Sequence, residues 1–188
     1  MSNEFIFLRH ALTNVDLSKP ADQWDLSEEG IKNIKEKVQS GVFDDIEIII
    51  SSAEKKALQT ASFIAKKLDK KIKSNASFNE LNRGFSYQTR KSEYDKKVER
   101  ALTDKEECAD NWESAKSTLD RFLVGVRALN LEFSNRKILI VCHGINLSLY
   151  FAHLLNIPDN QQFLRWKNLE FCAWGIVKNN KILKDIVK

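Results

Sequence analysis

Three short runs of apolar residues have the length and composition of buried strands. They cover residues 5–8, 46–50 and 138–142. Runs rich in Phe, Ile and Val without polar alternation are typical of strands that are covered on both faces of a sheet. Residues 71–74 are predicted as a further short strand. Two more strands are expected at 169–177 and 182–187, joined by a tight turn at Asn179-Asn180.

Segments with helical periodicity separate these strands. Apolar residues recur every three or four positions in four stretches, at residues 27–41, 53–67, 112–129 and 145–155. Ser27, followed by two glutamates, is typical of a helix start, and Gly41 is placed to end that helix. Alternating strands and helices predict an α/β fold. We expect a three-layer α/β/α sandwich with a mostly parallel central sheet and right-handed crossovers.

The chain is expected to form one domain over residues 1–188. A length of 188 residues suffices for a substantial core, and two prolines and six glycines leave no evident linker. Residues 83–110 are charged and weakly patterned. We interpret them as a cap-like insertion of short helices and loops outside the main core.

Charge and cysteine content narrow the class of protein. The net charge of +4 comes from lysines spread along the chain, which favours solvated helix faces over a nucleic-acid surface. No apolar run could cross a membrane, and the N-terminus lacks a signal-peptide pattern. The three cysteines are widely spaced, which is typical of reduced thiols and not of a disulfide framework or a zinc site. We therefore expect a cytoplasmic protein without a membrane or nucleic-acid partner.

Polar functional groups follow three of the expected strands. Arg9-His10, Ser51-Ser52 leading to Lys56, and His143-Gly144 each stand just past an apolar run. The carboxyl ends of parallel strands meet at one edge of a sheet, where open α/β folds bind their ligands. A helix starting after Ser52 would add free backbone N–H groups that suit an anion. Two histidines and two cations around a helix N-terminus predict a phosphoryl-binding pocket.

These residues also resemble a known family. Leu8-Arg9-His10-Ala11-Leu12-Thr13 is similar to the Arg-His-Gly-x-Thr signature of the histidine phosphatase superfamily, in its phosphoglycerate-mutase-like branch. Residues 26–30, Leu-Ser-Glu-Glu-Gly, resemble its Leu-Thr-x-x-Gly helix start, and residues 51–61 its Ser-x-Leu-x-Arg-Ala-x-x-Thr-Ala segment. Asn79-Glu80 with Gly84 resembles the stretch that carries the family's acid, and Val141-Cys142-His143-Gly144 its second histidine motif. The resemblance runs from Phe5 to about Leu155.

The resemblance implies a metal-independent phosphomonoesterase that needs no cofactor and acts on a small phosphorylated substrate. It makes His10 the nucleophile that becomes a phosphohistidine, with His143 and Glu80 as further catalytic residues. Glu80 would protonate the leaving oxygen and then help to activate water. The expected phosphate-binding residues are Arg9, Lys56, Thr13 and Asn14.

Three positions depart from the family pattern. Lys56 stands where the family has its second arginine, and the loss of a bidentate contact would cost roughly 1 to 3 kcal/mol of transition-state binding. That corresponds to a rate lower by about tenfold to a hundredfold. Ala11 replaces a glycine. Asp16 replaces an asparagine that touches phosphate, so it would repel the substrate unless Asn14 takes over that contact. Lys55 lies about 100° away from Lys56 on a helix and is the weaker candidate.

Other interpretations remain open at this stage. His10 and His143 could be core histidines, and Glu80 a surface carboxylate. A phosphoglycerate mutase is the nearest alternative of the same fold, although the short segment from Glu80 to His143 favours a phosphatase. A phosphate-binding or regulatory protein with a weakened site is another, and phosphohistidine proteins are possible substrates. Arg83, Arg90 and Lys91 could read substrate charge. The pattern indicates neither the physiological substrate nor the oligomeric state.

Overall fold

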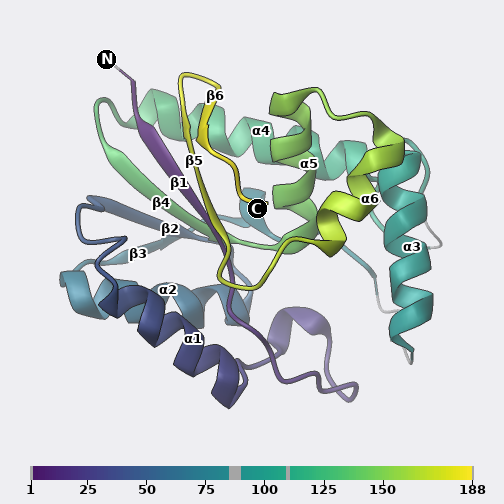
Figure 1. Ribbon diagram of the computed structural model, residues 1–188, viewed down its shortest axis with the longest axis horizontal. Helices are drawn as coiled ribbons and strands as arrows, with labels where there is room; N and C mark the ends of the chain where they lie inside the picture. Colours follow the sequence, from purple (N-terminus) through teal and green to yellow (C-terminus); the bar gives the residue numbers. More distant parts are fainter. Residues whose placement is uncertain (1, 85–89, 109–110, 188) are drawn as a thin grey trace.

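The computed structural model describes residues 2–84, 90–108 and 111–187, and it confirms the α/β fold class (Figure 1). Six strands form one sheet in the order β3-β2-β4-β1-β5-β6. The strands are β1 Glu4–Arg9, β2 Ile48–Ser51, β3 Ile72–Ser74, β4 Lys137–Cys142, β5 Trp174–Lys178 and β6 Lys181–Lys184. Strands β3, β2, β4 and β1 run parallel to one another, whereas β5 and β6 are antiparallel. The sheet is therefore mostly parallel, as expected.

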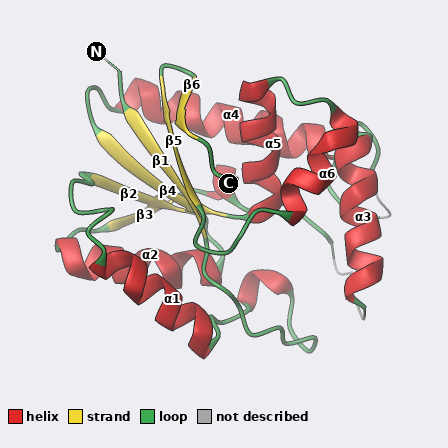
Figure 2. Cartoon of the chain, viewed as in Figure 1, coloured by secondary structure: helices red, strands yellow, loops and turns green. Residues whose placement is uncertain are grey.

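Helices cover both faces of this sheet (Figures 1 and 2). Helices α1 Glu28–Gln39 and α2 Lys55–Leu68 lie on one face, and α4 Ala115–Glu132 and α5 Gly144–Leu155 lie on the other. Strand β1 shows how the two cores form, because its side chains alternate. Phe5 and Phe7 pack toward α4 and α5, while Ile6 and Leu8 pack toward α1 and α2. This double burial explains the unbroken apolar run at the N-terminus.

A close contact joins the loop after β1 to the start of α1. The Ser27 hydroxyl accepts the Gly30 N–H at 3.0 Å and donates to the Leu12 carbonyl at 3.2 Å. A Cβ atom on Gly30 would lie 2.1 Å from that carbonyl oxygen, so only glycine fits. The helix start predicted at Ser27 is confirmed. It also fixes the loop that follows the Arg9-His10 end of β1.

The insertion differs from the expectation of short helices outside the core. Its described part contains one helix, α3 Lys91–Thr103, whose Val98, Ala101 and Leu102 are buried. This helix packs on α6 Asp159–Lys167, which the sequence pattern did not indicate. Tertiary burial of one apolar stripe on α3 explains the difference. Residues 85–89 and 109–110 of the insertion lie outside the described residues.

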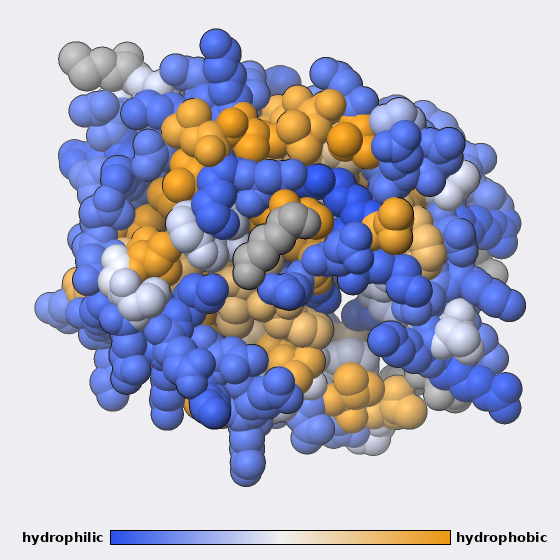
Figure 3. All heavy atoms as spheres, in the orientation of Figure 1, coloured by the Kyte–Doolittle hydropathy of each residue, from blue (hydrophilic) through white to orange (hydrophobic). Residues whose placement is uncertain are grey.

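The C-terminal segment also differs in part. The strand expected at 169–177 begins only at Trp174, and residues 169–173 instead pass beside the end of β1. Asn179 and Asn180 both have positive φ angles, 53° and 57°, which confirms the tight turn before β6. Hydrophilic side chains cover most of the face shown in Figure 3, as expected for lysines on solvated helices. Among the described residues, no helix is long and apolar enough to cross a membrane.

Candidate active site

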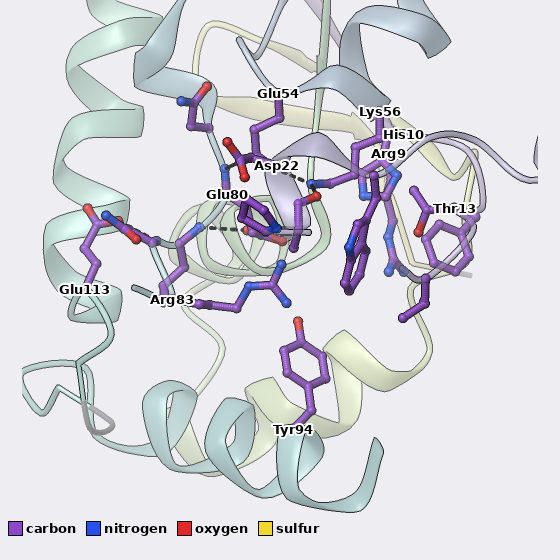
Figure 4. A pocket seen from close by; sticks show the side chains of 18 of the residues that line it. Arg9, His10, Thr13, Asp22, Glu54, Lys56, Glu80, Arg83, Tyr94 and Glu113 are labelled. Atoms are coloured by element: carbon purple, nitrogen blue, oxygen red, sulfur yellow. Dashed lines mark hydrogen bonds and ion pairs between the residues drawn. The ribbon is translucent and has the colours of Figure 1, made fainter. Parts of the chain in front are cut away.

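A cavity of about 1160 Å³ opens at the carboxyl edge of the parallel strands. Its lining includes Arg9, His10, Thr13, Lys56 and Glu80, which the sequence placed in the site. Figure 4 shows Arg83 and Tyr94 reaching into the same cavity from the opposite side. The cavity is far larger than a phosphate ion, so it has room for a leaving group.

His10 follows β1 and is only 6% exposed. Its Nδ1 lies 2.8 Å from the Ala11 carbonyl oxygen. A carbonyl can only accept, so Nδ1 carries the proton and Nε2 keeps its lone pair. Burial, then the positive charge of neighbouring groups such as Lys56 and Arg9, holds the pKa of His10 well below its usual value. The geometry therefore presents a neutral imidazole with a free Nε2, which is the form required of a nucleophile.

Arg9 is held at the base of the site by an aromatic ring and a carbonyl. Its guanidinium lies 4.0 Å from the centre of the Phe171 ring and donates to the Leu169 carbonyl oxygen. Its Nε has no hydrogen-bond partner among the described residues. Gly144 packs on the guanidinium, since a Cβ there would lie 3.1 Å from Arg9 Cζ. Burial lowers the pKa of Arg9, and the charge of Glu80 partly offsets that effect.

Lys56, not Lys55, lines the cavity. The Lys56 side chain is 5% exposed, and its ammonium donates to the Ala21 carbonyl at 2.7 Å and to the Glu54 carboxylate. Lys55 points away and pairs with Asp25 at 2.7 Å on the surface. The first turn of α2 therefore delivers one cation to the cavity, and that cation already has a carboxylate partner.

His143 directly precedes α5 and is fully buried, with its ring centre 5.1 Å from that of His10. Its Nε2 lies 2.7 Å from the Ser52 hydroxyl. The single hydroxyl proton of Ser52 goes to Asn79 Oδ1 at 3.0 Å, so Nε2 must carry the proton that it shares with Ser52. Burial, then Lys56 and further cations, lowers the pKa of His143 well below its usual value. His143 thus faces Ser52 and does not line the cavity.

Glu80 lies at the N-terminus of α5. Its carboxylate accepts the backbone N–H groups of Ile145 at 3.0 Å and Asn146 at 3.1 Å. A third N–H, from Leu81, lies 3.1 Å from the same side chain. Free N–H groups at a helix start suit a carboxylate. The sequence motif placed Glu80 in the site, and this helix end fixes its direction.

Arg121 positions the segment that carries Glu80. Its guanidinium donates to the carbonyl oxygens of Ser77, Asn79 and Glu80 at 2.7 to 3.0 Å. It also pairs with Glu113 at 2.8 Å. Nothing in the pattern of the long helix α4 pointed to Arg121, because the carbonyl groups that it binds lie more than forty residues away along the chain.

Two residues of the loop after β1, Ala11 and Asp16, depart from the family pattern but have less effect on the cavity than their sequence positions suggested. Hydrogen bonds from Ser18, and then from Lys19, lower the pKa of Asp16 to about 2. Asp16 and Asn14 are absent from the described cavity lining, and Asn14 is exposed. Ala11 is fully buried, and its N–H donates to Thr60 Oγ1 at 3.0 Å. In this arrangement, the Asp16 carboxylate is engaged by Ser18 and Lys19 and does not face the cavity.

Sequence reasoning missed Glu54 and Phe171 as well as Arg121. Glu54 had a signal, because it stands where the Ser-x-Leu-x-Arg segment has leucine. Phe171 lay within a stretch interpreted as strand. Among residues 2–84, 90–108 and 111–187, no group of three or more His, Cys, Asp and Glu side chains could hold a metal ion.

Comparison with known proteins agrees with this geometry. The family model of the histidine phosphatase superfamily (branch 1) matches residues 5–185. The chain therefore belongs to the histidine phosphatase superfamily. Among curated proteins, none matches it significantly in sequence.

Solved structures share the fold at low sequence identity. YhfR from Bacillus stearothermophilus has a TM-score of 0.79 at 16% identity, covering 99% of this chain and 96% of that one. A mycobacterial glucosyl-3-phosphoglycerate phosphatase has a TM-score of 0.75 at 16% identity, with all of both chains covered. A mutant phosphoserine phosphatase from Entamoeba histolytica, in complex with phosphoserine, has a TM-score of 0.72 at 20% identity, covering 96% of each chain.

Proposed function

We propose that this chain is a metal-independent phosphomonoesterase that hydrolyses small phosphorylated metabolites through a phosphohistidine. One observation carries the proposal. The Ala11 carbonyl holds the proton of His10 on Nδ1, which leaves a lone pair on its Nε2, and His10 lines a cavity together with Arg9 and Lys56. Structural relatives named as phosphatases of phosphorylated small molecules support the substrate class.

The reaction has two halves. His10 Nε2 forms a bond to phosphorus while the bond from phosphorus to the leaving oxygen breaks, and that oxygen takes a proton. Water then attacks phosphorus, the N–P bond breaks, and inorganic phosphate leaves a restored His10. Arg9 and Lys56 stabilise the charge on the phosphoryl oxygens, which is the main lever in this chemistry. Thr13 lines the same wall and supplies a hydroxyl donor.

Glu80 is our proposed proton carrier, and His143, which does not line the cavity, packs beside the His10 ring. Glu80 lines the cavity, and its charge acts on Arg9. It would deliver the proton to the leaving oxygen and later receive one from water. The three cysteines are unpaired thiols, which suits a reducing compartment, so a cytoplasmic location is part of the proposal.

A second candidate is a phosphate-binding or regulatory protein with little turnover. The buried pair between Lys56 and Glu54 favours it, because that pair takes away part of the charge that the reaction needs. The two functions make different predictions for the same protein, since binding would persist where hydrolysis does not.

A panel of phosphomonoesters, assayed in the presence of a metal chelator, tests the proposal. We expect wild-type protein to release phosphate and His10→Ala to lose at least about a thousandfold in kcat, since it lacks the nucleophile. A rapid-quench experiment should trap acid-labile phosphate on the wild-type chain. Lys55→Ala is the matched surface control and should keep full activity. Equal turnover by His10→Ala would refute the assignment of the nucleophile, and phosphate binding without turnover would favour the binding protein.

A further inference from the structure

Glu54 brings a carboxylate into a cavity whose other groups suit an anion. It directly precedes α2, lines the cavity wall and is 8% exposed. Figure 4 shows its side chain among Lys56, His10 and Glu80. A buried carboxylate in this place needs a physical reason, because a phosphate is also anionic and the two repel each other.

Two hydrogen-bond donors bind this carboxylate, and the His143 ring lies close to it. One oxygen accepts from the Lys56 ammonium, and the other accepts the Glu80 N–H at 2.6 Å. The second oxygen also lies 3.5 Å from His143 Nε2. The proton on that nitrogen goes to the Ser52 hydroxyl at 2.7 Å, so His143 lies beside the carboxylate without donating to it. An ammonium and a backbone N–H are groups that a phosphoryl oxygen would also use.

We propose that Glu54 is an internal anion of the phosphate pocket, where it competes with the substrate's phosphoryl group for Lys56. It thereby weakens the binding of a dianionic phosphate. The inference rests on the proposed function only in taking phosphate as the ligand. The proposal also connects the two departures from the Ser-x-Leu-x-Arg segment. Glu54 and Lys56 form a buried ion pair where the segment has a leucine and an arginine.

This pairing has a consequence for restoring the family arginine. An arginine at position 56 would still face the carboxylate of Glu54 and would form a bidentate pair with it. The single change Lys56→Arg would therefore leave the competition in place. Only removal of the carboxylate would free the cation at position 56 for a phosphoryl group.

Direct binding of inorganic phosphate and of vanadate, measured by calorimetry, tests the proposal. Glu54→Gln keeps the size of the side chain and removes its charge. We expect its phosphate Kd to fall at least about tenfold, which equals about 1.4 kcal/mol. Glu54→Leu should behave likewise, with thermal unfolding showing that each variant is folded. Asp22→Asn is the matched control, because Asp22 is an exposed carboxylate that lines the same cavity, and its Kd should stay within about twofold.

A double variant sharpens the test. Lys56→Arg alone should tighten phosphate binding less than about threefold, whereas Glu54→Leu with Lys56→Arg should exceed the product of the two single effects. An unchanged or higher phosphate Kd in folded Glu54→Gln would overturn the proposal, since it would mean that Glu54 only holds Lys56 in place. Tighter phosphate binding without any turnover would uphold the role of Glu54 and refute the phosphatase. Turnover by the wild type together with an unchanged phosphate Kd in Glu54→Gln would support the phosphatase and refute the role of Glu54.

Discussion

The buried histidines of the site should make this fold sensitive to mild acid. Burial, with positive neighbours, holds the pKa values of His10 and His143 well below 6.5 in the folded chain. The unfolded chain takes up these protons near pH 6.5, whereas the folded chain does not. The stability that the two neutral imidazoles contribute is therefore complete above pH 6.5 and is lost as the pH falls.

The size of the loss follows from proton linkage. Between pH 7.5 and pH 5.5, an unfolded histidine with a pKa of 6.5 contributes about 1.4 kcal/mol if its folded counterpart stays neutral. Two such residues give a fall of about 2.7 kcal/mol in the free energy of unfolding. Most carboxylates titrate below this window, so the histidines dominate it.

Urea unfolding at pH 7.5 and pH 5.5, in phosphate-free buffers of equal ionic strength, measures this fall. Phosphate is left out because a ligand that binds the folded state would add its own stabilisation. His10→Gln and His143→Gln should each remove about half of the fall. The third histidine of the chain, His153, is exposed on α5, so His153→Gln is the matched control and should leave it unchanged. Two results would refute the reasoning. One is a decrease in the wild-type free energy of unfolding of less than about 0.5 kcal/mol. The other is an undiminished decrease in the variant that carries both His10→Gln and His143→Gln.

Further substitutions test the other contacts. Gly30→Ala should lower the free energy of unfolding by about 2 kcal/mol or more in urea titrations, because its Cβ would lie 2.1 Å from the Leu12 carbonyl oxygen. Arg121→Ala should reduce kcat about tenfold or more by freeing the segment that carries Glu80, and Arg121→Lys should restore part of it; equal kcat values would contradict this role. Lys56→Ala should weaken vanadate binding about tenfold, whereas Lys55→Ala, which removes only a surface ion pair, should change vanadate binding and stability by less than about 0.5 kcal/mol.

Much of the frame of the site could be predicted, because the signals are local. The apolar run before Arg9 and the one before His143 each indicate a buried strand on their own. The helix start that follows Ser52 likewise places Lys56 in the first turn of a helix. Parallel strands then bring these three ends to one edge by a general rule of α/β sheets. The pairing of β1 with β4 and of β4 with β2 agrees with that rule.

The directions of the side chains within that frame could not be predicted. The sequence position of Asp16 suggested repulsion of phosphate, but its side chain bonds to Ser18 and Lys19 instead. Helix α3 looked peripheral because its charged residues outnumber its apolar ones, yet one stripe of it packs into the core. Both outcomes depend on which neighbours are present after folding, and a local pattern does not contain that information.

The sequence by itself determined the fold class, the family and five of the residues that reach the cavity, namely Arg9, His10, Thr13, Lys56 and Glu80, since periodicity and short motifs are properties of neighbouring residues. Only the tertiary structure decided how those residues are partnered. The proton on His143 Nε2 follows from Ser52, 91 positions away. The place of Glu80 depends on Arg121, 41 positions away. The Glu54 carboxylate meets His143 through the pairing of β2 with β4. These contacts join segments far apart in the chain, and they set the charge and the tautomers on which the chemistry depends.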